Sequence, residues 1–215
     1  MCSSDLIIQF DDALRDLETG RIDTLVTPTY VAMESLKNRP KFKKLSVIHV
    51  GFQDSAPLGV VIDEERFTYD GTTALMVRGC RKLGLVTHGT RPTSSIGAFW
   101  KGYDRAVAEG GAGYKAMEFS AGFGLPGGVG LAEELLAKPR EERPDGLIVT
   151  DDWIAMGLTL TLRNKSEDYR PLLSVQTNMQ VPLAFALPVI RFDVDVDELA
   201  SRGVELTINT LRKPG

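Results

Sequence analysis

The sequence predicts an α/β protein built from parallel sheets flanked by helices. Short runs rich in Val, Ile and Leu recur along the chain, and segments with helical apolar spacing lie between most of them. Such alternation of strand and helix is typical of βαβ units, whose strands are parallel. The runs expected to form strands are Leu6–Phe10, Thr24–Val26, Leu45–Val50, Val60–Ile62, Leu85–Thr87, Tyr114–Phe119, Leu147–Thr150, Leu172–Val175 and Val189–Phe192.

Three helices are predicted from apolar residues that repeat on one helical face. We expect each of these faces to pack in the core. The first face comprises Ile96, Trp100, Tyr103 and Val107, and the second comprises Val129, Ala132, Leu135 and Leu136. The third helix extends from about Asp195 to Arg212, and its stripe comprises Val196, Leu199, Ala200, Val204, Ile208 and Leu211.

The connecting segments are rich in Gly, Pro and charged residues. Gly51 to Gly59 links one strand to an expected edge strand, and Pro139 to Pro144 encloses a charged turn before a buried strand. The stretch from Asp63 to Asp70 is polar with interspersed aromatics, and a helix is expected to follow from Gly71. We interpret that polar stretch as a crossing between two lobes.

The composition is that of an ordinary soluble globular protein. The chain has 215 residues, a net charge of −4, 43% apolar residues and 25% charged residues. The length fits one large domain or two small ones. The negative charge argues against a broad nucleic-acid surface, which needs a basic patch. No run approaches the roughly 18 apolar residues of a membrane span, so no membrane partner is expected.

The chain start and the cysteines predict a cytoplasmic protein. Met1 to Asp5 lacks the basic start and apolar core of a signal peptide. Cys2 and Cys80 do not make a disulfide framework, which favours a reducing compartment. His49 and His88 have no Cys or acid partners at metal-ligand spacing, so no metal site is expected.

The stretch Leu147 to Gly157 is the most informative motif. A short apolar run ends in Asp151 and Asp152, and a helix-like segment starts at once. One acid suits the helix N-cap, where a side-chain oxygen accepts a free backbone N–H. The other would point into the crevice beyond the strand ends, where open α/β sheets bind ligands. The alternative is that both acids only cap and solvate the helix.

Two further polar turns follow predicted strands. Ser95 precedes a helix whose first turn carries Phe99 and Trp100, so a hydroxyl and aromatic rings would border the crevice. The alternative for Trp100 and Tyr103 is core packing, because large aromatics are mostly buried. Asn178 can donate and accept hydrogen bonds, as polyol recognition needs, or can serve as a turn residue ahead of Pro182.

A glycine motif raises the alternative of a dinucleotide site. Gly122-Phe-Gly124-Leu-Pro-Gly127 matches G-x-G-x-x-G between a strand and a helix. Pro126 removes an N–H that the loop should donate, and no acid ends the next strand at the usual spacing. Glycine clusters more often serve as turns. No nucleophile and base lie in a recognisable catalytic pattern, so we expect neither an enzyme nor a cofactor.

Together these segments resemble the effector-binding core of the lac repressor family of bacterial transcription regulators. The most specific match is Thr150-Asp151-Asp152-Trp-Ile-Ala-Met-Gly157 to the family's N-D-x-x-A-x-G. Similar stretches are Asp11 to Val26, Leu45 to Gly51, Gly71 to Ala74 followed by Leu83-Gly84, Gly102 to Ala106, and Val189 to Leu211.

The resemblance implies a two-lobed, type I periplasmic-binding-protein-like fold with ligand in the cleft. It places residues 1–63 in an N-terminal lobe, 64–184 in a C-terminal lobe and 185–215 back in the first. It also implies ligand-binding roles for Asp151, Asp152, Asn178, Ser95 and Phe99, with Trp100 beside them. Phe99 takes the place of the family's sugar-binding Arg, and losing that fork of donors changes what can bind.

The resemblance further implies that the chain is truncated at both ends. The family's first strand and helix and its helix-turn-helix DNA-binding domain are expected to be missing. We therefore expect a ligand-sensing domain that binds a sugar or polyol, forms a homodimer, and contacts operator DNA only through a domain missing here. In such a domain, ligand binding would shift a population between two lobe arrangements. The alternatives are a solute receptor of a sugar transporter and, less favoured, a dinucleotide-dependent enzyme.

Overall fold

The structure is a computed structural model that describes residues 15–16, 19–21, 24–27, 46–51, 58–91, 97–181 and 183–212. The chain divides into two compact units. The first comprises Met1–Ile62 and Asp197–Gly215, and the second comprises Asp63–Val196. The expected strand Leu6–Phe10 lies outside the described residues.

The first unit contains a parallel sheet against which one helix packs. The strands β1 (Thr24–Thr27), β2 (Ser46–Gly51) and β3 (Gly59–Val61) are ordered β1-β2-β3, so β3 lies at an edge among the described strands of this sheet, as predicted. The helix α7 (Val196–Leu211) meets the sheet at a glycine. A Cβ added to Gly203 would lie 2.6 Å from Val50 Cγ2, so only glycine lets this helix approach β2 so closely.

The second unit is built on a sheet of five parallel strands in the order β5-β4-β6-β7-β8. Because all strands are parallel, their carboxyl ends share one edge of the sheet. The strands are β4 (Lys82–Thr87), β5 (Lys115–Ser120), β6 (Gly146–Val149), β7 (Leu172–Asn178) and β8 (Val189–Val194).

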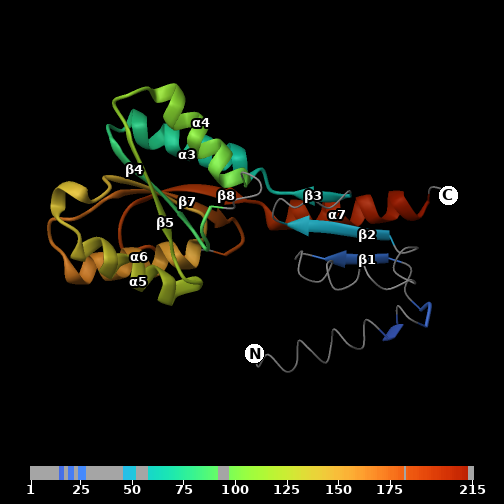
Figure 1. Ribbon diagram of the computed structural model, residues 1–215. Helices are drawn as coiled ribbons and strands as arrows, with labels where there is room; N and C mark the ends of the chain where they lie inside the picture. Colours follow the sequence, from blue (N-terminus) through green and yellow to red (C-terminus); the bar gives the residue numbers. More distant parts are fainter. Residues whose placement is uncertain are drawn as a thin grey trace. The chain divides into compact units, whose positions relative to one another are not determined.

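Helices cover both faces of this sheet, with a separate core under each pair (Figure 1). One pair is α3 (Glu64–Val77) and α4 (Ala98–Gly110), and the other is α5 (Gly124–Ala137) and α6 (Asp152–Lys165). A short 3-10 turn, η2 (Arg140–Glu142), lies between α5 and β6. The predicted alternation of strand and helix is thereby confirmed. Burial on both faces accounts for the apolar runs of the central strands β4, β6 and β7, whereas the edge strands β5 and β8 are more exposed.

The start of α3 differs from the sequence expectation. The polar stretch Asp63–Asp70 was expected to be a crossing, but the helix already begins at Glu64. Asp63 caps it by accepting a hydrogen bond from Arg66 N at 2.9 Å. Phe67, Gly71 and Leu75 lie on the buried face of this helix. Because glycine is not counted as an apolar residue, the helical spacing of this face is not recognised in the sequence. The expectation that the helix begins only at Gly71 is therefore wrong.

The chain returns to the first unit later than the boundary at residue 185 expected from the sequence. Val189–Val194 pairs in parallel with β7, which holds this strand in the second unit, and the return begins at Asp197. The predicted apolar stripe of α7 is also largely exposed: Val204, Ile208 and Leu211 are 59%, 42% and 55% accessible. Since the buried contact is made by Gly203, the helix turns a different face to the sheet, and the expected core packing of this stripe is wrong.

Candidate functional site

Polar side chains gather where three neighbouring strands of the second unit end. His88 follows β4, the pair Asp151 and Asp152 follows β6, and Asn178 is the last residue of β7. These strands are adjacent in the order β4-β6-β7, so their carboxyl ends lie next to one another. This edge of an open parallel sheet is where ligands bind in α/β proteins.

Asp151 is the N-cap of α6. Its Oδ1 accepts a hydrogen bond from Ile154 N at 2.8 Å. Its Oδ2 lies 3.2 Å from Nε2 of His88, which attaches the end of β4 to the start of α6. Both carboxylate oxygens are therefore engaged within the chain, and the predicted capping role is confirmed for this acid.

Asp152 is the more unusual acid because it is buried, with only 6% of its surface exposed. Burial raises the pKa of its carboxyl group, and the negative charge of Asp151 raises it further. Hydrogen bonds from the backbone of Trp153, Asp152 and Asn178 act in the opposite direction. A carboxylate held in a shielded position with a perturbed pKa is typical of a functional site.

Asn178 reaches toward this acid from the neighbouring strand. Its Nδ2 lies 3.5 Å from Oδ2 of Asp152, at the long limit of a hydrogen bond. The amide is half-buried, so it retains capacity for a further partner. The structure thus brings Asp151, Asp152 and Asn178 together, in agreement with their shared position at predicted strand ends.

Sequence reasoning missed two aromatic rings beside these groups. The imidazole of His88 stacks on Phe123, with ring centroids 4.8 Å apart and an angle of 22° between the planes. Phe123 is 79% exposed although it is large and apolar. Both residues follow strands, His88 after β4 and Phe123 after β5. The expectation that binding residues follow the carboxyl ends of strands, which indicated Asp151, could therefore have identified them too. An exposed ring next to strand-end acids offers an apolar surface to a ligand.

The remaining predicted residues lie on or before α4. Ser95 lies outside the described residues. Phe99 is partly buried against the core under α3 and α4, and Trp100 belongs to that core with 8% of its surface exposed. The indole Nε1 of Trp100 donates a hydrogen bond to Glu118 Oε2 at 3.1 Å. Trp100 thus has the packing role that was the alternative to ligand contact.

The glycine motif is accounted for by close backbone approaches. A Cβ on Gly127 would lie 1.8 Å from the carbonyl oxygen of Gly122, and Gly124 has a φ of +60°. Both positions therefore require glycine for the turn itself. Among the described residues, no group of three or more His, Cys, Asp or Glu is placed to hold a metal ion.

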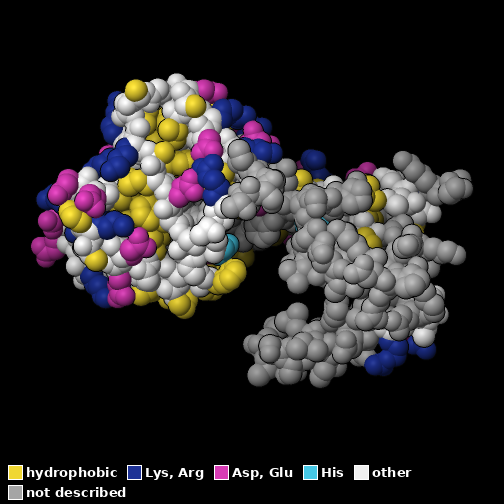
Figure 2. Space-filling model, in the orientation of Figure 1, with side chains coloured by type: hydrophobic (Ala, Val, Ile, Leu, Met, Phe, Trp, Pro, Cys, Tyr) yellow, Lys and Arg dark blue, Asp and Glu magenta, His cyan; other side chains and the backbone are white. Residues whose placement is uncertain are grey.

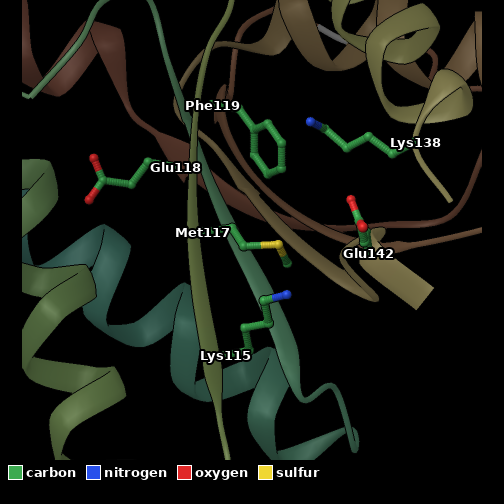
Figure 3. A pocket seen from close by; sticks show the side chains of 6 residues that line it. All are labelled: Lys115, Met117, Glu118, Phe119, Lys138 and Glu142. Atoms are coloured by element: carbon green, nitrogen blue, oxygen red, sulfur yellow. The ribbon is translucent and has the colours of Figure 1, made fainter. Parts of the chain in front are cut away.

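A separate hollow of about 380 Å³ lies along the edge strand β5. Met117 and Phe119 form its apolar side, and Lys115, Lys138 and Glu142 border it (Figure 3). Figure 2 shows hydrophobic side chains bordered by charged ones on this face of the second unit. The strand-end acids do not line this hollow, so it is not part of the candidate site.

Among the described residues, no helix has the length and hydropathy needed to cross a membrane.

The chain resembles solved structures of bacterial regulators. No family model and no curated protein matches its sequence. Transcription regulator CcpA of Lactococcus lactis is 19% identical with a TM-score of 0.73, over 100% of this chain and 80% of that chain. The Cra transcriptional dual regulator from Pseudomonas putida, in complex with fructose 1-phosphate, is 22% identical with a TM-score of 0.67, over 92% and 74% of the two chains.

A third likeness is to a LacI family transcriptional regulator from Lactobacillus casei with bound sucrose. The identity is 18% and the TM-score 0.70, over 95% of this chain and 77% of that chain. At these identities the likeness shows the fold. The fold predicted from the sequence is confirmed: the chain has an α/β architecture, with parallel sheets flanked by helices, that matches these solved structures.

Proposed function

We propose that this chain is the ligand-sensing domain of a bacterial transcription regulator. It binds a small sugar or polyol at the strand-end site of the second unit, and this binding controls how the full-length homodimer holds DNA. The observation that carries the proposal is the buried Asp152 with Asn178 beside it at the strand ends. Its fold neighbours CcpA and Cra are transcription regulators, which supports a regulator here.

The site chemistry suits hydroxyl groups. A carboxylate accepts hydrogen bonds only, whereas an Asn side chain both donates and accepts. Asp152 and Asn178 together can therefore bind adjacent hydroxyls of a sugar, with the charged acceptor contributing the stronger bond. The exposed ring of Phe123 can lie against the apolar face of a sugar ring. Two of the fold neighbours were solved with sucrose and with fructose 1-phosphate, which supports a sugar-like ligand here.

The proposal is tested by calorimetry with a panel of sugars and polyols, followed by Asp152→Asn. The substitution keeps the side-chain shape but removes the charged acceptor. We expect affinity for the best ligand to fall about tenfold or more, since hydrogen bonds to charged groups contribute roughly 1.5–3 kcal/mol.

The control for this experiment is Glu133→Gln. It makes the same chemical change on an exposed side chain of α5 that pairs with Lys165. Unchanged affinity in Asp152→Asn would remove Asp152 from the binding site, and no binding by the unaltered chain across the panel would contradict the function.

The homodimer is supported by an exposed apolar face on α6. Trp153 and Leu160 are 49% and 46% exposed, and Met156 lies between them on the same side of the helix. No charged residue occurs from Trp153 to Leu162. The outward face of a solvated helix is normally polar, so an apolar one indicates a contact surface. Two copies related by a twofold axis would bury this α6 face against itself.

A further inference from the structure

We infer that the strand-end site selects uncharged sugars or polyols and rejects their phosphorylated forms. This inference rests on the proposed function and narrows its ligand class. The fold alone does not decide the matter, because its neighbours were solved both with sucrose and with fructose 1-phosphate. The charges at this site favour an uncharged ligand over a phosphorylated one.

The first argument is the density of negative charge. Asp151 and Asp152 are consecutive, and Asp152 is buried with 6% exposure, where water screens its charge poorly. The negative charge of Asp151 is one cause of the raised pKa of Asp152. A phosphate dianion hydrogen-bonded near this pair would add repulsion that a hydroxyl group does not experience.

The second argument concerns the start of α6. The amino end of a helix is a ready site for anions because its first N–H groups are free. Here the chain's own acids use it: Asp151 accepts from Ile154 N at 2.8 Å, and Asp152 accepts from the backbone of Trp153. A ligand phosphate would have to displace a carboxylate to reach these donors.

The third argument is that, among the described residues of the second unit, two arginines that lie on or after strands of this sheet are paired with acids. Arg91, which follows β4, pairs with Asp104 at 2.7 Å and with Glu118. Arg191 on β8 lies 3.1 Å from Asp193. A bidentate arginine is the usual protein partner of phosphate, and both of these arginines are held by carboxylates.

The test compares matched pairs by calorimetry at neutral pH: glucose with glucose 6-phosphate, ribose with ribose 5-phosphate, and fructose with fructose 1-phosphate. We expect at least one neutral sugar to bind, with its phosphorylated partner at least tenfold weaker. Equal or tighter binding of the phosphorylated member would overturn the inference and leave the proposed function standing. If no member of any pair binds, and no sugar or polyol of the wider panel does, both fail.

A second measurement assigns the discrimination to the acid pair. The substitution Asp151→Asn removes one charge from the pair but keeps the side-chain oxygen that caps α6. The affinity for the neutral sugar divided by the affinity for its phosphorylated partner should then fall at least threefold. Glu133→Gln removes one charge from a remote exposed site and should leave the ratio unchanged. If both variants leave it unchanged, the acid pair is not the source of selectivity and the inference is overturned.

Discussion

At the scale of single residues, Asp152 is where ligand recognition and stability oppose each other. Its carboxyl group is shielded from water and lies beside a second acid, and both effects raise its pKa. The folded chain at neutral pH therefore carries a charge that is less favourable than in the unfolded chain. Such a residue is expected at a binding site, where the ligand supplies the missing hydrogen-bond donors.

This opposition predicts a pH dependence. Because the folded pKa of Asp152 is raised, the folded chain holds this proton more tightly than the unfolded chain. The group therefore favours folding at pH values below its unfolded pKa, and that contribution is lost as pH rises through the raised value. The free energy of unfolding of the native chain, minus that of Asp152→Asn, should increase from neutral pH to about pH 4.

Urea denaturation at several pH values measures this difference. The Glu133→Gln variant corrects for general effects of losing one carboxylate from the surface of α5. A difference that stays constant, or that decreases toward acid pH, would mean that Asp152 is not held in an unfavourable charged state.

At the scale of elements, glycines determine how closely α5 and α6 pack. A Cβ on Gly128 would lie 2.0 Å from the carbonyl oxygen of Ile154, and one on Gly157 would lie 2.2 Å from that of Leu125. Both obstacles are backbone atoms, which cannot move aside as a flexible side chain can. The start of α6, with its acids, is therefore positioned by contact between two helix backbones.

Gly157→Ala should accordingly destabilise the second unit by about 1–3 kcal/mol, the usual penalty for overpacking. The matched control is Gly130→Ala on α5, where a Cβ meets nothing within 4 Å. That change should be neutral or stabilising by up to about 1 kcal/mol, because alanine favours a helix over glycine. Thermal denaturation of both variants distinguishes them, and equal melting temperatures would contradict the packing argument.

The same elements show what sequence patterns can and cannot reveal. The strands and the cap at Asp151 could be predicted because each leaves a local signature: an apolar run, or an acid before a helix. The buried faces of α3 and α7 could not be predicted, since Gly71 and Gly203 make close contacts there and glycine is not recognised as part of an apolar pattern. The position of Phe123 after β5 could have marked it as a site residue, but the sequence does not show that its ring is exposed. The roles of Ser95 and Phe99 stay predictions.

At the scale of the whole molecule, the proposed dimer depends on the apolar face of α6. Leu160→Asp places a charge in that face, and we expect the mass in solution, measured by light scattering, to fall from that of a dimer to that of a monomer. Burying an unpaired carboxylate at an interface is strongly unfavourable.

Val77→Asp is the matched control, because Val77 is 80% exposed at the end of α3 and the chemical change is the same. The control should keep the mass of the native chain. A native chain that is already monomeric at micromolar concentration, or a Leu160→Asp variant that stays dimeric, would contradict the assignment of this face.

The division into two units also has a consequence for biosynthesis. The second unit is one continuous stretch, Asp63–Val196, whereas the first needs Asp197–Gly215 to join residues made much earlier. Translation supplies the chain from its amino end, and domains generally fold as units as they emerge. The second unit, with its acids and exposed ring, can therefore fold on the ribosome before α7 is synthesised, whereas the first unit is completed only once α7 has packed on its sheet.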